Sequence, residues 1–256
     1  MGLIRGGLFY IVCVLLVVSL ILAGVFITIS KSLSYENLKT ELTKISLEKS
    51  SEFDINSAFP EMQAKCLNNS GGGVSFSENS GFNINIPCTV VSQGSEAVLS
   101  YAVDSIIGDM YYKEYDCGFF NCFKQGEPPI FLISQHSHDY FKSKFYLMLL
   151  TSLVLIILLF FLVENKPNFP ITTGIVLIIS SLPFMKLDFF SKFFIDASYL
   201  YFLSIVLSNT RFIFLIYLIS GIALVGVGIG LHFYLFGESI AEKIEKWKSK
   251  KKEKEK

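Results

Sequence analysis

"LFYIVCVLLVVSLILAGVFITI", residues 8–29, contains no charged side chain. An α-helix needs about 20 predominantly apolar residues to cross the hydrocarbon core of a bilayer, so this run is long enough to span it. Three further apolar runs follow at residues 145–163, 171–185 and 212–236. The run at 171–185 is short and carries Pro183, so a core helix of a soluble protein is a stronger alternative there than elsewhere. Together the runs predict an integral membrane protein with four helical spans.

The distribution of apolar residues decides the class of protein more clearly than their number. Hydrophobic residues make up 52% of the 256 residues, and the mean hydropathy is +0.51. Ordinary soluble domains are about 45–50% apolar, so this percentage alone is not decisive. The apolar residues gather in the long runs, and the charged residues lie between them. The formal net charge of zero therefore hides a segregation of charge along the chain.

Basic flanks indicate which side of the membrane each end faces. Residues 237–256 contain eight lysines and five glutamates, and Arg5 precedes the first run. Short basic flanks stay in the cytoplasm, which places both termini there and requires an even number of spans. The apolar stretch at 189–207, interrupted by Lys192 and Asp196, could be a fifth span, an interfacial segment or a re-entrant segment. Because an even number of spans is required, we favour an interfacial segment on the outer side.

These arguments divide the chain into four parts. Residues 1–30 form an N-terminal transmembrane anchor, 31–143 an extracytoplasmic α+β domain inserted between the first and second spans, and 144–236 a three-span membrane domain. Residues 237–256 form a lysine-rich cytoplasmic tail. We expect a multi-pass cell-membrane protein with an uncleaved signal anchor. Cleavage as a signal peptide after Ala23 is the alternative, and the apolar run continues beyond that site for longer than a typical signal core.

The domain between the first and second spans is acidic, with fourteen acidic residues, eight lysines and no arginine. An amphipathic helix at 35–49 is expected to continue the first span as a stalk. A stripe of apolar residues predicts a second helix at 95–112, with Ser95 as its N-cap. Strands are expected at 82–86 and 88–93. The domain should therefore be α+β, with a small sheet and one covering helix.

Four of the five cysteines lie in this domain: Cys66, Cys88, Cys117 and Cys122. An even number of cysteines in a small domain on the oxidising side predicts two disulfides, and four cysteines allow three pairings. We expect Cys66 to pair with Cys88, and Cys117 with Cys122. A redox dithiol usually has Cys-x-x-Cys spacing, whereas four residues separate Cys117 from Cys122. A zinc site is disfavoured because Cys66 and Cys88 lack local partners.

Other polar groups carry weaker predictions. His136 and His138 could share a metal ion on a strand but not on one helix face, and Asp139 is better explained as the N-cap of the second span. His232 is an ionisable group in the fourth span, which suggests a proton relay, but no mid-span carboxylate accompanies it. We therefore predict no catalytic residue, no metal and no cofactor, and no partner of the nucleic-acid class.

Three surface features suggest contacts with helices, sugars and lipids. Gly226 and Gly230 form a Gly-x-x-x-Gly pair in the fourth span, which predicts close packing against another span of the chain rather than a second copy. Asn68 begins an Asn-Asn-Ser sequon, which permits glycosylation on the outer side. Beyond the fourth span, Trp247 and three lysines predict a helix that binds lipid headgroups. These lysines are Lys250, Lys251 and Lys252. The oligomeric state is left open.

Several segments resemble an uncharacterised family of archaeal multi-span membrane proteins. They are "LIRGGLFYIVCVLL", "IPCTVVSQG", "YYKEYDCGFFNCF", "FLVENKP" and "SLPFMKLDFF", and the resemblance spans most of the chain. It implies a membrane protein without an assigned activity, and it brings no functional residues to this sequence.

The sequence predicts a non-enzymatic integral membrane protein that presents its outer domain for binding, assembly or envelope organisation. Membrane lipids and a protein are the expected partners. A membrane thiol–disulfide oxidoreductase that uses Cys117 and Cys122 is the first alternative, by analogy with four-helix proteins that pass disulfide electrons to quinones. A small transporter component is the second alternative, and it needs a polar face on the third or fourth span. The residues that offer one are Ser180, Ser181, Ser220 and His232.

Overall fold

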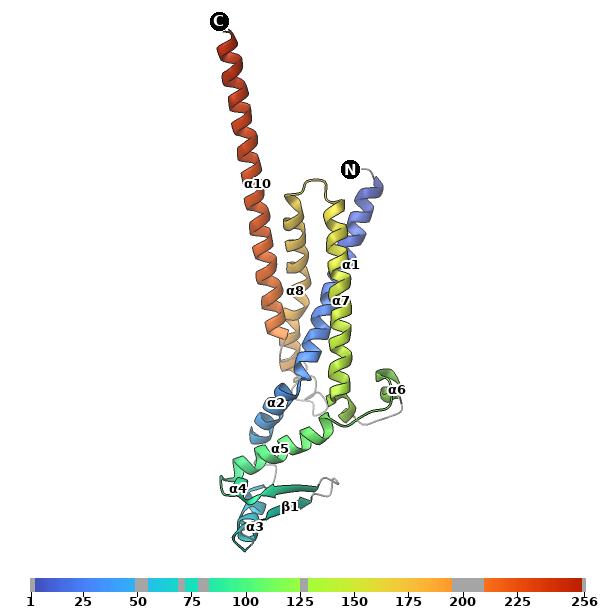
Figure 1. Ribbon diagram of the computed structural model, residues 1–256, viewed down its shortest axis with the longest axis vertical. Coiled ribbons are helices and arrows are strands. Elements are labelled where there is room, and N and C mark those ends of the chain that lie inside the picture. The colour runs from blue at the N-terminus through green and yellow to red at the C-terminus, as the bar shows by residue number, and fades with distance from the viewer. Residues whose placement is uncertain are drawn as a thin grey trace. The chain divides into compact units, whose positions relative to one another are not determined.

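A computed structural model describes residues 3–48, 55–68, 72–77, 83–124, 129–194 and 210–254. The described chain divides into two compact units. The membrane unit holds residues up to Thr28 together with the described residues from Lys144 onwards. The intervening unit holds the described residues from Ile29 to Ser143. Figure 1 shows the helices and strands of both.

Among the described residues, four helices are long and apolar enough to cross a membrane. They are α1 (Leu3–Ser32), α7 (Gln135–Leu162), α8 (Asn168–Phe194) and α10 (Thr210–Lys254). Their candidate spans are residues 5–32, 135–162, 168–185 and 210–235. The expected four-span architecture, with a helical and two-stranded region between the first and second spans, is therefore confirmed.

The third span continues beyond the apolar run that predicted it. Pro183 lies inside α8, and the helix extends to Phe194 rather than ending at Met185. The first six residues of the 189–207 stretch therefore belong to this helix, and the remainder of that stretch lies outside the described residues. A proline interrupts helical hydrogen bonding locally, but neighbouring groups can satisfy the freed backbone, so prolines are tolerated in transmembrane helices.

Helices α1 and α7 are antiparallel. The hydroxyls of Ser19 and Ser152 are hydrogen bonded at 2.9 Å, and Ser19 also donates to the carbonyl of Met148. Leu16 and Leu159 are fully buried in the cluster that holds these helices together. Many apolar side chains of α7, such as Leu150, Leu153 and Phe161, are exposed, which suits a helix whose outer face meets lipid.

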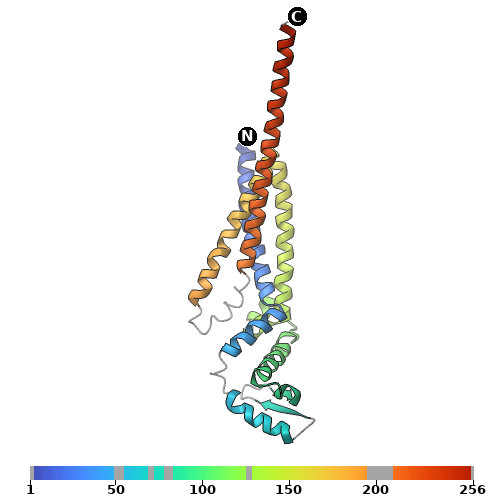
Figure 2. The same cartoon turned by 90° about the vertical axis from the view of Figure 1, so that its left-hand side faces the viewer.

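Helices α8 and α10 pack closely through glycines. A Cβ on Gly174 would lie 2.6 Å from the carbonyl oxygen of Gly221, and a Cβ on Gly228 would clash with Ile171. Small residues allow two backbones to approach in this way. Figure 2 shows the two helices inclined to one another.

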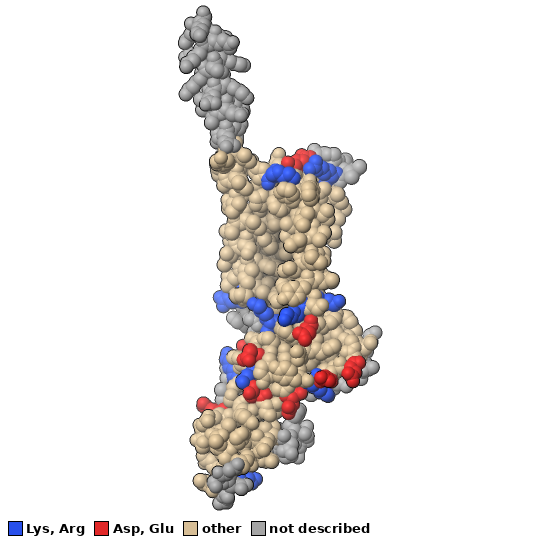
Figure 3. Space-filling model, in the orientation of Figure 1, with Lys and Arg blue, Asp and Glu red and all other residues tan. Residues whose placement is uncertain are grey.

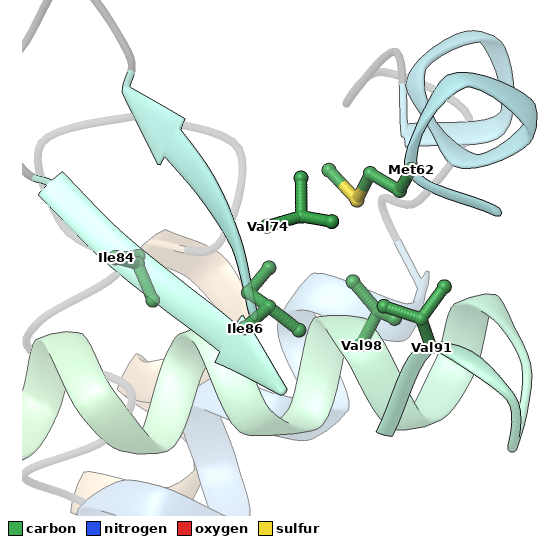
Figure 4. Close-up of a cluster of buried hydrophobic side chains, with 6 residues drawn as sticks. All are labelled: Met62, Val74, Ile84, Ile86, Val91 and Val98. Carbon is green, nitrogen blue, oxygen red and sulfur yellow. The ribbon is translucent and has the colours of Figure 1, made fainter. Parts of the chain in front are cut away.

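The intervening unit contains shorter elements. They are α2 (Tyr35–Glu48), α3 (Ile55–Asn68), β1 (Gly73–Ser77), β2 (Asn83–Pro87), α4 (Cys88–Val91), α5 (Ser95–Tyr111), α6 (Phe119–Lys124) and a 3-10 turn, η1 (Pro129–Ile133). The strands pair in antiparallel register, with Val74 opposite Ile86. Their buried side chains meet Met62, Val91 and Val98 in one core, shown in Figure 4.

Helix α5 is the covering helix that the apolar stripe predicted, but its start differs. The N-cap is Gly94 rather than Ser95, and Gly94 has a φ of +113°. Only glycine adopts this conformation without strain, so Gly94 turns the chain from α4 into α5. Val98 and Ile107 are buried on the face of α5 that packs inward.

Two further expectations for this unit are wrong. Residues 88–93 do not form a strand, because Cys88–Val91 is a single helical turn that follows Pro87 directly. The predicted stalk at 35–49 does not continue the first span: α1 ends at Ser32, and α2 begins at Tyr35. Leu33 between them is buried beside Leu38, Ile107 and Tyr111, so α2 folds onto α5 instead of extending α1.

Candidate functional site

The first disulfide joins Cys66 at the end of α3 to Cys88 at the start of α4, with their Cα atoms 5.5 Å apart. Both cysteines are half-buried and pack against the core formed by Met62, Val74 and Ile86. The bridge therefore closes the core at the point where the sheet leads into α4. The bridge thus packs against the core as an apolar side chain would. The predicted pairing of Cys66 with Cys88 is present in the structure.

The second disulfide joins Cys117 to Cys122, also with a Cα separation of 5.5 Å. Cys122 is completely buried, and its backbone N–H donates to the carbonyl of Gly118 at 3.0 Å, which closes the turn into α6. Both predicted bridges are thus formed. Cys13, in α1, is the one free cysteine of the five.

Phe119, which lies between the two cysteines of the second bridge in sequence, belongs to an aromatic cluster. The ring of Phe119 stacks on Tyr140 of α7 at 4.3 Å with an interplanar angle of 5°, and it also contacts Phe131 at 5.5 Å. Tyr115 meets Phe131 edge-on at 5.0 Å. Phe131 is buried. Tyr115 and Phe119 therefore pack against η1 and the first turns of α7, and the disulfide closes the turn into α6.

Helix α7 begins differently from the prediction. Ser134, not Asp139, is its N-cap, because the Ser134 hydroxyl accepts a hydrogen bond from the backbone N–H of Ser137 at 3.3 Å. Asp139 lies one turn inside the helix, where Oδ1 is 3.1 Å from Nδ1 of His138. Within the described ranges, no three His, Cys, Asp or Glu side chains are grouped closely enough to hold a metal ion.

A polar clamp joins α2 to α5. The Tyr35 hydroxyl donates to Oδ1 of Asp104 at 2.7 Å, and the ammonium of Lys39 lies 2.8 Å from the same oxygen. These two hydrogen bonds hold the pKa of Asp104 below its usual value, and the bond to Asp104 raises the pKa of Tyr35 to about 12. Burial raises the pKa of neighbouring Tyr111 to about 12 as well. Sequence reasoning missed this clamp.

A polar cavity of about 320 Å³ opens beside the second disulfide. Its walls include Tyr112, Glu114, Tyr115, Asp116, His136 and Asp139. Lys113 also lines it, with its ammonium 5.3 Å from the centre of the Tyr115 ring. Three carboxylates thus share the cavity with a single lysine, so its field favours cationic groups. A second, apolar cavity of about 390 Å³ lies against Cys66, Leu67 and Cys88.

The predicted glycine pair is not where the helices meet. A Cβ on Gly226 or Gly230 would meet no described atom within 4 Å, whereas Gly221 and Gly228 face α8. The Gly-x-x-x-Gly pair lies in a transmembrane helix, as predicted. However, the face of α10 that packs on α8 does not include it. The prediction that Gly226 and Gly230 pack against another span is therefore wrong. Gly221 and Gly228 make that contact instead.

The remaining predicted site residues have described backbone only. Asn68 is the last residue of α3, and its side chain and the rest of the sequon lie outside the described residues. Trp247, Lys250, Lys251 and Lys252 lie within α10, so the tail continues the fourth span as one helix. The contacts of their side chains also fall outside the described part of the chain.

The polar residues within the spans do not share one face. Ser180 and Ser181 are fully buried, and each donates to a carbonyl of its own helix, at Val176 and Ile178. Ser220 and His232 are exposed on the surface of α10. These four residues therefore do not lie on one common face, and the transporter alternative stays a prediction from the sequence.

Comparisons with protein-family models, curated proteins and solved structures find no match to this chain. The resemblance to archaeal membrane proteins stays a prediction from the sequence.

Proposed function

We propose that this chain is a non-enzymatic multi-pass membrane protein that presents residues 31–143 on the extracytoplasmic side for binding, assembly or envelope organisation. One observation carries the proposal: all four cysteines of this region are paired, and each bridge is packed into the fold. Cys66 and Cys88 adjoin the core, and Cys122 is fully buried. Stable structural disulfides are typical of small domains on the oxidising side of a membrane.

The membrane unit supports an orientation with both termini in the cytoplasm. Arg5 near the start of α1 donates to the carbonyl of Leu162 at 3.1 Å and lies 3.6 Å from Glu164, so the N-terminus shares one end with the α7–α8 loop. Gly228 packs on Ile171, so the C-terminal half of α10 runs toward the same end. Charged side chains gather at this end of the unit (Figure 3).

The basic tail favours a cytoplasmic location for this end by the positive-inside rule. With four spans, residues 31–143 would then face the outside. The Trp247 segment lies on the cytoplasmic side, where its lysines attract anionic lipid headgroups. A protein partner would meet the outer domain, and the cavity walled by Glu114 and Asp116 suits a partner with basic side chains.

Burial of Cys122 argues against the oxidoreductase alternative. Thiol–disulfide exchange requires an attacking thiolate to reach one sulfur and the other sulfur to leave, so it depends on access to the bridge. Cys122 has no exposed surface and Cys117 is half-buried, so access to the bridge is restricted. A structural bridge is the simpler reading of this arrangement.

Cysteine labelling tests the orientation directly. Cys13 would first be replaced by alanine, and a single cysteine would then be introduced at Glu96, on the exposed surface of α5, or at Asn165, in the exposed α7–α8 loop. A membrane-impermeant maleimide should label Glu96→Cys in intact cells, and Asn165→Cys only after permeabilisation. The reverse pattern would overturn the proposed orientation.

A further inference from the structure

Helix α6 presents an exposed aromatic side chain beside the start of a membrane span. Phe120 is 63% exposed, although its neighbours Phe119 and Cys122 are packed inward. A single exposed apolar side chain is common on protein surfaces and marks no site by itself, so the case for Phe120 rests on where it lies. The question is which contact suits Phe120.

Ring contacts fix α6 against the first turns of α7. Phe119 stacks on Tyr140 at 4.3 Å and meets Phe141 edge-on at 5.3 Å, and Phe120 reaches Tyr140 at 5.9 Å. The Cys117–Cys122 bridge closes the backbone of this turn. The position of Phe120 along α7 is therefore set by several contacts rather than by one flexible loop.

Helix geometry places that position at the depth of the lipid headgroups. Helix α7 is continuous from Gln135 to Leu162, and its uncharged apolar run begins at Phe145. Tyr140 precedes Phe145 by five residues, which is about 7.5 Å along an α-helix. The interfacial layer on each side of the hydrocarbon core is about 5–8 Å thick. Tyr140, and the α6 rings that contact it, thus fall within this layer.

The geometry points to α6 as a membrane-interface anchor, in which Phe120 inserts between the lipid headgroups of the bilayer that α7 crosses. Aromatic side chains are enriched at this depth because an apolar ring can enter the acyl boundary while neighbouring polar groups stay hydrated. Tyr140 and Lys142 supply such polar groups on the same helix. The disulfide and the Phe119–Tyr140 stack hold the anchor against its own span.

This inference goes beyond the proposed function and does not depend on which side of the membrane the region faces. A single-tryptophan reporter can test it, because Trp247 is the sole tryptophan of the chain. In a Trp247→Phe background, Phe120→Trp reports on α6, and Leu67→Trp is the matched control. Leu67 is 84% exposed at the end of α3, in the same unit.

The full-length variants would be reconstituted in phosphatidylcholine vesicles with and without brominated acyl chains. We expect bromolipid to quench Phe120→Trp, whose emission should be blue-shifted and protected from acrylamide, while Leu67→Trp is quenched by acrylamide alone. Equal acrylamide quenching of both variants would overturn the inference. A blue-shifted Phe120→Trp without bromolipid quenching would also overturn it, because the ring would then be buried in protein.

A second variant separates the anchor from a general folding defect. Adding Cys117→Ser and Cys122→Ser to the Phe120→Trp reporter should reduce bromolipid quenching, while the same pair added to Leu67→Trp leaves its acrylamide quenching unchanged. Undiminished bromolipid quenching without the bridge would contradict the claim that the disulfide holds α6 in place. These fluorescence readouts do not depend on which side of the membrane α6 faces. The maleimide experiment can therefore contradict the proposed orientation while this inference holds, and the fluorescence experiment can contradict this inference while the orientation holds.

Discussion

The hydroxyl of Tyr35 donates a 2.7 Å hydrogen bond to Oδ1 of Asp104, joining α2 to α5 across 69 positions of sequence. Lys39 reaches the same oxygen from α2, one turn further along. The ring of Tyr35 also meets Tyr111 edge-on at 5.5 Å. One residue at the start of α2 therefore combines a polar and an aromatic contact with α5, and this explains why α2 folds onto α5 rather than extending α1.

Removing the Tyr35 hydroxyl should loosen this contact. Tyr35→Phe keeps the ring but leaves Asp104 without one donor, and we expect a loss of about 1 kcal/mol in the local stability of α2 and α5. Hydrogen–deuterium exchange of the full chain in detergent would detect it as faster exchange in both helices. Tyr112→Phe is the control, because Tyr112 is exposed and its ring contact survives the change. Equal exchange in the two variants would contradict the role of the hydroxyl.

Acid should weaken the same clamp. The folded-state pKa of Asp104 lies below its unfolded value, chiefly because Lys39 and Tyr35 donate to the carboxylate. The ionised group therefore stabilises the fold above the unfolded pKa of about 4, and this stabilisation is lost as pH falls through the folded-state pKa. Thermal unfolding at pH 7 and pH 3 should show a smaller pH dependence for Asp104→Asn than for the wild type. Asp109→Asn, on the exposed face of α5, should behave like the wild type.

The membrane spans could be predicted because each rests on a long local signal. A run such as residues 8–29 needs no tertiary information to be recognised as a span. Tertiary information is needed, however, to predict which face of a span packs against its neighbour. The sequence shows glycines along α10, but which of them face α8 depends on how the two helices are rotated about their axes, and this rotation selected Gly221 and Gly228 instead of Gly226 and Gly230.

The intervening unit was less predictable because its elements are short and held by distant contacts. Residues 88–93 are rich in β-branched side chains, yet Cys88–Val91 forms a helical turn fixed by the bridge to Cys66 and by the burial of Val91. Helix α3 carries Pro60 inside it and was not predicted. The disulfide pairing was predicted correctly.

Helix packing in the membrane unit predicts a sharp difference between two glycines. Gly174→Val should separate α8 from α10, because the new Cβ would lie 2.6 Å from the Gly221 carbonyl oxygen and 2.9 Å from the Val225 backbone nitrogen. We expect a cost of about 1–3 kcal/mol, the usual range for overpacking, seen as a lower thermal midpoint in detergent. Gly226→Val, in open space, should leave the midpoint unchanged. A midpoint lowered equally by both substitutions would contradict this helix interface.

The two disulfides should differ in how much they stabilise the fold. The Cys66–Cys88 bridge closes a loop with a sequence separation of 22, and the Cys117–Cys122 bridge closes one of 5. Chain entropy gives about 3 kcal/mol for the longer loop and about 2 kcal/mol for the shorter. Double serine variants compared by denaturant unfolding should follow this order. The reverse order would show that the chain-entropy model does not govern these bridges.

The most direct test of the central claim is the thiol state of Cys66, Cys88, Cys117 and Cys122 in intact cells. Free thiols would be blocked with a membrane-impermeant reagent, the sample reduced mildly, the released thiols labelled and the peptides mapped by mass spectrometry. If the bridges are structural and face the oxidising side, all four cysteines will be oxidised and will resist mild reduction. A Cys117–Cys122 pair that is partly reduced and easily cycled would contradict the account and favour the oxidoreductase.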